Sequence, residues 1–333
     1  RDRLRSRGLG DVYKRQVEMC EKCNITFIGP TAEMMDKMGN KSQARLTMIE
    51  AGVPVVPGTK EPVYDAKRGA VLAESIGYPV MIKASSGGGG KGMRIALGPD
   101  DFEENFKVAQ LESVRGFGDN TMYIEKYVQE PRHIEFQIMA DKYGNVVQFG
   151  ERDCSIQRNH QKMIEESPSV ALTPELRRRM GDAAVRAAKA VHYESAGTIE
   201  FLLDKDKNFY FMEVNTRIQV EHGVTEMMTG VDLIKEQIKI ASGEHLAIKQ
   251  QDVKLSGAAI EMRINAENPY KKFAPCPGKI SDLHIPGGNE GRVDTAVYTG
   301  YTIPPFYDSM IMKIITFLPI KVGEVFLSCQ RSC

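Results

Sequence analysis

Residues 209–221 read Phe-Tyr-Phe-Met-Glu-Val-Asn-Thr-Arg-Ile-Gln-Val-Glu, and from position 213 onward every odd position is polar. The even positions between them hold Val, Thr, Ile and Val. In an extended chain, successive side chains point to opposite sides, so the odd positions would all face one side: Glu213, Asn215, Arg217, Gln219 and Glu221. A solvated face of an amphipathic strand is the simplest interpretation, but the segment that precedes it favours a site.

Residues 196–203, Ala-Gly-Thr-Ile-Glu-Phe-Leu-Leu, are nearly all apolar and contain a single carboxylate, Glu200. If they form a hairpin with 209–215 around a loop at 205–208, Glu200 lies directly opposite Glu213, with the two Cβ atoms about 5 Å apart. Two carboxylates that close repel each other unless a cation lies between them. Asn215 can add a third oxygen, and an all-oxygen set suits Mg²⁺ or Mn²⁺. The hairpin therefore predicts a metal site at these three residues.

A glycine-rich loop, Ser85-Ser86-Gly87-Gly88-Gly89-Gly90-Lys91-Gly92, connects predicted strands at 79–84 and 93–97. A dinucleotide-binding fingerprint would need a helix after the loop, and a Walker A loop would need Ser or Thr after the lysine, so neither motif fits. The remaining interpretation is a hairpin whose backbone N–H groups can close over polyphosphate. A mobile surface turn is the alternative, but a plain turn does not justify the entropy cost of ordering consecutive glycines. With the metal site, the loop indicates chemistry on a nucleoside triphosphate.

Helices are expected at 41–51, 64–76, 100–114, 173–191 and 231–240, and further strands at 24–28, 122–128, 133–140 and 146–151. Thr173 and Pro174 are suited to the N-cap and first positions of the fourth helix. Because several strands form hairpins, the fold class is α+β (mixed α/β) and not one doubly wound parallel sheet. The 333 residues include 44 basic and 44 acidic side chains, and this neutral balance argues against a nucleic-acid binder. No apolar run approaches the length of about 18 residues that spans a membrane, and the scattered cysteines favour the reducing cytoplasm.

Between about residues 17 and 317, the chain resembles biotin carboxylase, a member of the ATP-grasp superfamily. The strings that carry the resemblance are FIGP at 27–30, GYPVMIKASSGGGGKGM at 77–93, IEKYVQEPRHIEFQ at 124–137, ERDCSIQRNHQK at 151–162, MEVNTRIQVEH at 212–222, TGVDLIKEQI at 229–238, EMRINAENP at 261–269 and YDSM at 307–310. The resemblance implies an ATP-grasp fold with a small lid subdomain and a larger antiparallel-sheet subdomain. It is closest to the biotin carboxylase subunit of bacterial acetyl-CoA carboxylase, an enzyme of fatty acid biosynthesis. Pyruvate, propionyl-CoA and methylcrotonyl-CoA carboxylases share the module.

The resemblance also implies roles for individual residues. ATP would be bound by Lys41 and Lys83 at the phosphates, by the lid glycines Gly87, Gly88, Gly89, Gly90 and Gly92, by Glu125, Lys126, Val128 and Leu202 at the adenine, and by His133, Gln157 and His160 around ribose and phosphate. The metal ligands would again be Glu200, Glu213 and Asn215. Bicarbonate would be bound by Arg217, Gln219, Val220 and Lys162. The catalytic residues would be Glu221 as base, Arg263 beside the biotin enolate, and Arg217 and Lys162.

The implied activity is that of an ATP-dependent ligase that carboxylates biotin on a carrier protein. Bicarbonate would attack the γ-phosphate of ATP to give carboxyphosphate, with two Mg²⁺ or Mn²⁺ ions as cofactors. The implied partners are bicarbonate, a biotin carboxyl carrier protein and carboxyltransferase subunits, and the full-length protein would be a homodimer. Another ATP-grasp ligase, such as a carbamoyl phosphate synthetase, and an inactive nucleotide-binding fragment are the alternatives.

The sequence suggests five segments with different origins. Residues 1–16 are expected to be a non-native leader, although a basic nucleic-acid arm is the other interpretation, and 318–333 to be a divergent tail. Residues 17–55 would end the N-terminal domain of the family, 56–127 would form the lid, and 128–317 the remaining, incomplete subdomain. We therefore expect a truncated fragment with weak or no activity.

The sequence also has Gly223 where the family has proline, which is expected to loosen a strand after Glu221.

Overall fold

The computed structural model describes residues 5–39, 41–85, 92–159 and 161–319, with the backbone alone at 5–13, 41–42 and 117. The chain divides into two compact units, each of which is described by itself. The first unit contains the residues up to Phe27, Thr31–Pro131 and Phe201–Glu213. The second unit contains Ile28–Pro30, Arg132–Glu200 and the residues from Val214 onward. The subdomain limits expected from the sequence stay a prediction.

The first unit begins with three helices, α1 (Arg5–Lys22), α2 (Ala32–Gly39) and α3 (Lys41–Glu50). Helix α1 includes most of the segment that was expected to be a leader, and Lys14 Nζ lies 2.8 Å from Asp36 Oδ1 of α2. The strand expected at 24–28 was wrong. Asn24 has a φ of 53°, and the amide of Ile25 donates to the carbonyl of Cys20 at 2.8 Å, so these residues terminate α1 instead.

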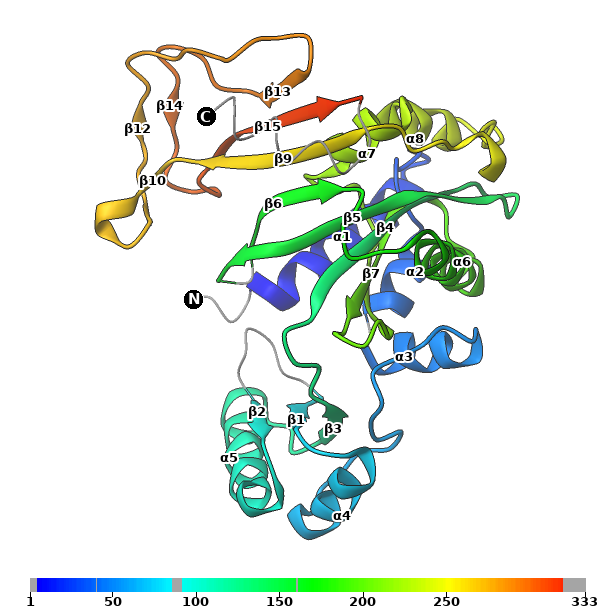
Figure 1. Cartoon of the computed structure of the whole chain (residues 1–333), viewed down its shortest axis with the longest axis vertical. Coiled ribbons are helices and arrows are strands. Elements are labelled where there is room, and N and C mark those ends of the chain that lie inside the picture. Colours follow the sequence, from blue (N-terminus) through cyan, green and yellow to red (C-terminus); the bar gives the residue numbers. More distant parts are fainter. Residues whose placement is uncertain (1–4, 40, 86–91, 160, 320–333) are drawn as a thin grey trace. The chain divides into compact units, whose positions relative to one another are not determined.

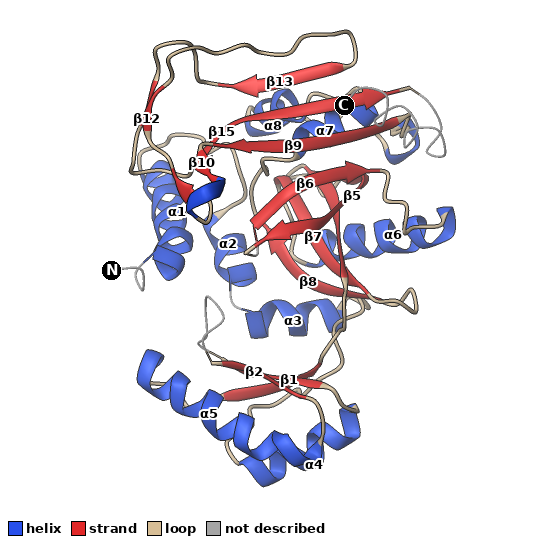
Figure 2. Ribbon diagram, turned by 60° about the vertical axis from the view of Figure 1, so that its left-hand side comes forward, coloured by secondary structure: helices blue, strands red, loops and turns tan. Residues whose placement is uncertain are grey.

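The predicted lid forms a three-stranded antiparallel sheet in the order β2-β1-β3, with β1 at Val80–Ala84, β2 at Met93–Ala96 and β3 at Met122–Lys126. Helices α4 (Ala66–Ile76) and α5 (Pro99–Phe117) pack against it (Figure 2). Their contact buries an apolar core that includes Ile82, Phe102, Phe106 and Ile124. Gly92 closes the β1–β2 hairpin at a φ of 72°, where a Cβ would lie 2.8 Å from the Cβ of Ala84.

The second unit is built on an eight-stranded sheet in the order β13-β15-β9-β6-β5-β4-β7-β8 (Figure 1). Its strands are β4 (Arg132–Ala140), β5 (Val146–Arg158), β6 (Gln161–Ser167), β7 (Ser195–Leu203), β8 (Phe209–Asn215), β9 (Ala258–Asn265), β13 (Gly291–Thr295) and β15 (Met310–Leu318). The predicted hairpin of residues 197–204 and 209–215 is confirmed as β7 and β8, whose tip belongs to the first unit. Strand β5 is longer than expected, and β6 was not predicted.

Three helices accompany this sheet: α6 (Pro174–Ala190), α7 (His222–Thr229) and α8 (Leu233–Ala241). Helix α6 packs against β4 and β5 and buries an alanine-rich face. Short segments complete the described chain: 3₁₀ turns at Gln250–Asp252 and Pro269–Lys271, and the strands β10 (Glu267–Asn268), β11 (Ala274–Pro275), β12 (Gly278–Lys279) and β14 (Thr302–Ile303).

The N-terminus of α6 is capped as the sequence predicts. Thr173 is extended, and its Oγ1 accepts a hydrogen bond from the amide of Leu176 at 3.2 Å, while Pro174 occupies the first helical position. Replacing a capping threonine with alanine leaves one amide at the helix N-terminus without a partner. We expect Thr173→Ala to lower the free energy of unfolding by about 1 kcal/mol, measured by urea denaturation. Thr173→Ser keeps the cap and serves as the control; equal stability of the two variants would contradict this role.

Candidate active site

Lys162, at the start of β6, is surrounded by three buried carboxylates. Its Nζ donates to Glu200 Oε1 at 2.8 Å, to Glu221 Oε1 at 2.9 Å and to Glu135 Oε2. The lysine side chain is 14% exposed and the carboxylates 3% or less. Burial by itself would lower the pKa of Lys162, but the carboxylates outweigh it and raise the pKa well above its usual value. Lys162 therefore stays an ammonium ion at any physiological pH.

Two guanidinium groups balance the remaining negative charge. Arg152, fully buried on β5, donates from Nε to Glu135 Oε1 at 2.6 Å. Arg263, on β9, donates to Glu221 Oε2 and, through Nε, to Glu165 Oε1, both at 2.8 Å. Burial opposes ionisation of Glu135, but Arg152 and Lys162 lower its pKa below the usual value. The cluster is thus a network of charges in which every carboxylate has a cationic partner.

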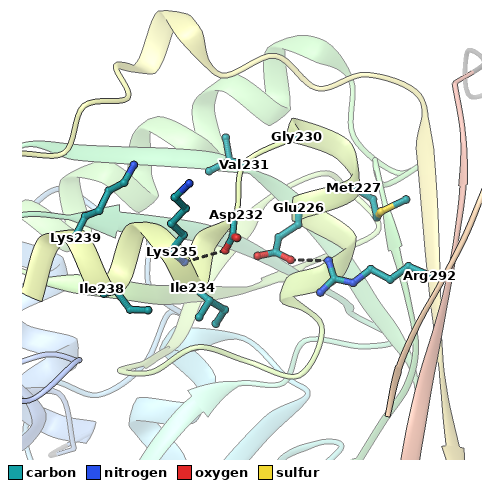
Figure 3. Close-up of a pocket in the computed structure, with 10 residues that line it drawn as sticks. All are labelled: Glu226, Met227, Gly230, Val231, Asp232, Ile234, Lys235, Ile238, Lys239 and Arg292. Carbon is teal, nitrogen blue, oxygen red and sulfur yellow. Dashed lines mark hydrogen bonds and ion pairs between the residues drawn. The ribbon is translucent and has the colours of Figure 1, made fainter. Parts of the chain in front are cut away.

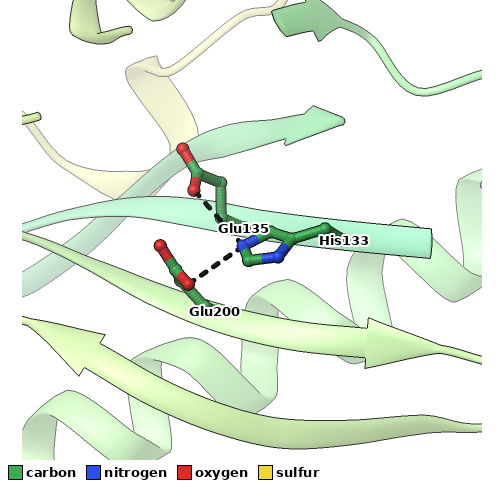
Figure 4. Close-up of side chains that lie close together, drawn as sticks. All are labelled: His133, Glu135 and Glu200. Atoms are coloured by element: carbon green, nitrogen blue, oxygen red, sulfur yellow. Dashed lines mark ion pairs between the residues drawn. The ribbon is translucent and has the colours of Figure 1, made fainter. Parts of the chain in front are cut away.

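Glu200, on β7, is the point where the predicted metal ligands and the lysine cluster meet. Its Oε1 accepts from Asn215 Nδ2 at 2.7 Å and from Gln219 Nε2 at 3.0 Å. Its Oε2 lies 2.9 Å from His133 Nε2, close enough for an ion pair although the ring N–H is not aligned for a hydrogen bond. Figure 4 shows His133 and Glu135 on β4 facing Glu200 on β7. Burial would raise the pKa of Glu200, but His133 and Lys162 lower it to about 2.

These residues fit a hard divalent cation. Glu200 is ionised at neutral pH and can supply a carboxylate ligand. Asn215 faces Glu200 with its amide nitrogen, while its Oδ1 accepts from Arg217 at 3.5 Å, so the amide must turn before its oxygen can join Glu200 as a ligand. The other predicted ligand, Glu213, belongs to the first unit, where its side chain is exposed. The opposition of Glu200 and Glu213 stays a prediction.

The extended stretch predicted for 213–221 was only partly correct. Strand β8 ends at Asn215, and α7 begins at His222, so residues 216–221 form a connection and not a strand. Gln219 and Glu221 nevertheless reach the same cluster as Asn215, because the connection returns them to Glu200 and Lys162. Arg217 remains exposed, with its guanidinium 3.5 Å from Asn215 Oδ1. Gly223 lies in the first turn of α7, not in a strand, and is buried against Ile315.

Two predicted positions on the second unit lie outside this network. Gln157 is exposed and donates to the carbonyl of Cys154 at 2.9 Å, and the carbonyl of Val220 accepts from Lys313 Nζ. Cys154 itself is fully buried, and its burial raises the pKa of the thiol well above the usual value. His160 lies outside the described residues, as do Gly87, Gly88, Gly89, Gly90 and the side chain of Lys41.

The first unit holds the remaining predicted nucleotide residues. Lys83 Nζ on β1 contacts Glu125 Oε2 on β3, and Arg45 NH1 lies 3.7 Å from Glu125 Oε1. Lys126 Nζ donates to the carbonyls of Gly77 and Tyr78, at 2.8 and 2.9 Å. The side chains of Val128 and Leu202 are both half-buried. The roles of these residues at the phosphates and the adenine stay predictions.

Sequence reasoning missed several members of the cluster. Glu135 and Arg152 are the two central ones, and a signal for Glu135 was present. Positions 133, 135 and 137 are polar and alternate with apolar residues along β4, although the strand is almost entirely buried. A row of polar side chains on a buried face requires internal partners. Arg152 is one of these partners, since it contacts both Glu135 and Gln137.

A second pair of carboxylates lies directly behind Arg263. Glu165 on β6 and Glu261 on β9 are cross-strand partners, and both are fully buried. Glu165 Oε2 and both oxygens of Glu261 have no hydrogen-bond partner. Burial raises the pKa of Glu165 to about 7 and that of Glu261 to about 8, despite the opposing charges of Arg263 and Lys313. The pair therefore holds protons near neutral pH.

A separate hollow of about 890 Å³ lies over α7 and α8 (Figure 3). Several of its charged groups have partners: Arg292 NH1 lies 2.6 Å from Glu226 Oε2, and Asp232 caps α8. None of the residues predicted for the active site lines it. Its lining consists of Glu226, Met227, Gly230, Val231, Asp232, Ile234, Lys235, Ile238, Lys239 and Arg292.

Comparison with known families identifies the class to which the chain belongs. The family model of the carbamoyl-phosphate synthase L chain ATP-binding domain matches residues 40–249, and that of the biotin carboxylase C-terminal domain matches 261–320. The first match defines the class, an ATP-binding domain of the ATP-grasp type. The second match distinguishes the chain from carbamoyl-phosphate synthases.

Similar proteins narrow the class further. Biotin carboxylase 1 of Bacillus subtilis is 57% identical over 301 residues, which are 90% of this chain and 67% of the relative. A pyruvate carboxylase subunit of Methanothermobacter thermautotrophicus is 56% identical over 300 residues, or 90% of this chain and 61% of the relative. A crystal structure of the biotin carboxylase domain of Hydrogenobacter thermophilus 2-oxoglutarate carboxylase, with MgADP and bicarbonate, has a TM-score of 0.84 at 48% identity, over 96% of this chain and 70% of that one. The chain belongs to the biotin carboxylase family.

The helices of the described residues do not meet the requirements of a membrane span. None of them combines the length and the apolar character that crossing a bilayer needs.

The protonated carboxylate pair makes stability depend on pH. In the unfolded chain, glutamates titrate near 4.5, whereas Glu165 and Glu261 titrate near 7 and 8 when folded. The folded state thus binds more protons in this window, and stability is lost as the pH rises through it. Glu261→Gln removes one ionisation, so its free energy of unfolding relative to the parent should rise by about 4 kcal/mol between pH 5 and pH 9, measured by urea denaturation.

Glu104→Gln, at an exposed position of α5, is the matched control and should show no such change. A constant difference between Glu261→Gln and the parent across this pH range would show that the pair is ionised throughout.

Proposed function

We propose that this chain performs the ATP-dependent carboxylation of biotin with bicarbonate as the carbon source. The observation that supports this most directly is the cluster of Lys162, Glu221 and Arg263, in which one carboxylate contacts two cations. Such a site can hold an anion beside a base, which bicarbonate requires. The chain's membership in the biotin carboxylase family supports the same reaction.

In this proposal, the second unit binds and activates bicarbonate. Lys162, Arg217, the amide of Gln219 and the backbone of Val220 hold the anion, and Glu221 removes its proton. Glu221 has both oxygens occupied by cations, so one contact must yield when the carboxylate accepts the proton. Bicarbonate oxygen then attacks the γ-phosphorus of ATP, ADP leaves, and carboxyphosphate forms.

Biotin is proposed to react in the same unit. Carboxyphosphate decomposes to CO₂ and phosphate, and the phosphate takes the ureido proton of biotin while CO₂ adds to that nitrogen. Arg263 stabilises the negative charge on the biotin oxygen. Carboxyphosphate hydrolyses easily, so water must be kept away. The burial of the surrounding carboxylates, at 3% exposed or less, is consistent with this requirement.

The residues proposed to bind ATP are those that the resemblance implies. The phosphates would be bound by Lys41 and Lys83 and covered by the loop of Gly87, Gly88, Gly89, Gly90 and Gly92. The adenine would be bound by Glu125, Lys126, Val128 and Leu202. The residues beside the ribose and phosphates would be His133, Gln157 and His160. Glu200, Glu213 and Asn215 would hold Mg²⁺ or Mn²⁺, which neutralises phosphate charge when bound. The MgADP in the Hydrogenobacter structure supports magnesium as the physiological ion.

The partners are also proposals. Biotin would arrive on a carboxyl carrier protein, and a carboxyltransferase would use the product. Two relatives, at 57% and 56% identity, are a biotin carboxylase and a pyruvate carboxylase subunit, which supports an acyl-CoA or a 2-oxo acid as the acceptor. The dimer in the Hydrogenobacter structure supports a homodimer. A cytoplasmic location is supported by the four free thiols in the described chain, Cys20, Cys23, Cys154 and Cys276.

The proposed base can be tested by replacing Glu221 with glutamine. The variant keeps the shape of the side chain but cannot take the proton of bicarbonate. We expect bicarbonate-dependent ATP hydrolysis to fall about 10²–10⁴-fold, whereas Mg·ATP binding, measured by calorimetry, should change little. Phosphate release with and without bicarbonate and biotin measures the activity.

Glu226→Gln is a closely matched control. Glu226 lies on α7, five positions from Glu221, and also pairs with an arginine, Arg292, at 2.6 Å. This variant should retain the parent rate. Parental turnover by Glu221→Gln would remove Glu221 as the base, and ATP hydrolysis that ignores bicarbonate would contradict the proposed function itself.

A further inference from the structure

Arg152 lies wholly inside the second unit, with none of its side chain exposed. All its donor nitrogens are engaged. Nε donates to Glu135 at 2.6 Å, NH1 to Gln137 and Thr225 at 2.8 Å each, and NH2 to Gln219 at 2.9 Å and Thr198 at 3.2 Å. A guanidinium has five N–H groups, and here five acceptors receive them. The site is therefore built for arginine in particular.

Two of these acceptors also contact the catalytic cluster. Glu135 accepts from Arg152 on one oxygen and from Lys162 on the other. Gln219 accepts from Arg152 through Oε1 and donates through Nε2 to Glu200 at 3.0 Å. Arg152 thus contacts Gln219, which is proposed to bind bicarbonate, and reaches Lys162 through Glu135.

The chemistry of the two neighbours fixes the orientation of the Gln219 amide. Arg152 can only donate hydrogen bonds, and the ionised Glu200 can only accept them. The amide oxygen must therefore face Arg152, and the amide nitrogen must face Glu200. If the guanidinium were absent, the carbonyl end of Gln219 would lose its partner, and the amide would be free to rotate.

We propose that Arg152 is a positioning residue for bicarbonate binding, acting through Gln219 and Glu135 without touching the substrate. This inference rests on the proposed function. Arg152 sets the direction of the Gln219 amide. It also holds Glu135 against Lys162, so that the Gln219 amide and the Lys162 ammonium group meet bicarbonate in one fixed arrangement. Preorganised donors of this kind avoid the cost of ordering side chains when the anion binds.

The test is Arg152→Lys. A lysine keeps the charge but has three N–H groups on one nitrogen, so it cannot hold Glu135 and Gln219 in the forked geometry. We expect the KM for bicarbonate to rise and kcat/KM to fall about 10²-fold, with a much smaller change in the KM for ATP. Bicarbonate binding is measured independently by line broadening of ¹³C-bicarbonate in NMR.

Arg177→Lys is the matched control. Arg177 lies on α6, and its Nε contacts both oxygens of the buried Glu151 at 2.8 Å, without contact to the cluster. It should lose stability but keep the parental affinity for bicarbonate. In a double-mutant cycle, Arg152→Lys should lower bicarbonate affinity less in the Gln219→Ala background than in the parent, because the part of its effect that passes through the Gln219 amide is already lost.

Each outcome decides between roles. Parental affinity for bicarbonate in a folded Arg152→Lys variant would reduce Arg152 to a structural residue and overturn the inference. If this variant does not fold, Glu135→Gln weakens one of the two contacts through which Arg152 is proposed to act, and a bicarbonate affinity unchanged from the parent would again overturn it. Failure of the parent chain to bind bicarbonate would instead contradict the proposed function.

Discussion

The contact of one ammonium group with three buried carboxylates is the constraint on which the second unit depends. Removal of Lys162 would take a cationic partner from Glu135, Glu200 and Glu221, which lie in a region from which water is nearly excluded. Lys162 cannot balance them alone, and this is why Arg152 and Arg263 complete the set. Charged side chains of the cluster come from five strands of the sheet: β4, β5, β6, β7 and β9. The charges can meet only if these strands pair in the observed order.

This arrangement suits a reaction between two anions. The three cations and three carboxylates of the central cluster nearly cancel, so an arriving anion meets fixed N–H donors and no large excess of either charge. Behind this layer, Glu165 and Glu261 hold protons, and one of them shares Arg263 with Glu221. The charge near Glu221 is therefore determined by neighbouring residues and not by access of solvent.

The sequence was most informative where the pattern was local. The β7–β8 hairpin and the cap at Thr173 depend on residues close together in the chain, and both were predicted. The continuation of β8 to residue 221 was wrong, because alternation of polar residues also suits a connection whose side chains return to one cluster. Glu165 opposite Glu261 could not be predicted, since it depends on the register of β6 against β9, which lie almost one hundred residues apart. The residues proposed to bind ATP and bicarbonate came from resemblance and remain to be tested.

The contacts of Arg152 also bear on how this chain folds. Its acceptors lie between 15 and 73 positions away along the sequence, on β4, on β7, before α7 and within it. Contacts of such long range form slowly, because large loops must close before they can be made. A guanidinium buried before all its acceptors arrive would be an uncompensated charge. The site therefore depends on packing across distant parts of the sequence, because the guanidinium has its full set of acceptors only when α7 and the connection before it lie against β4 and β7.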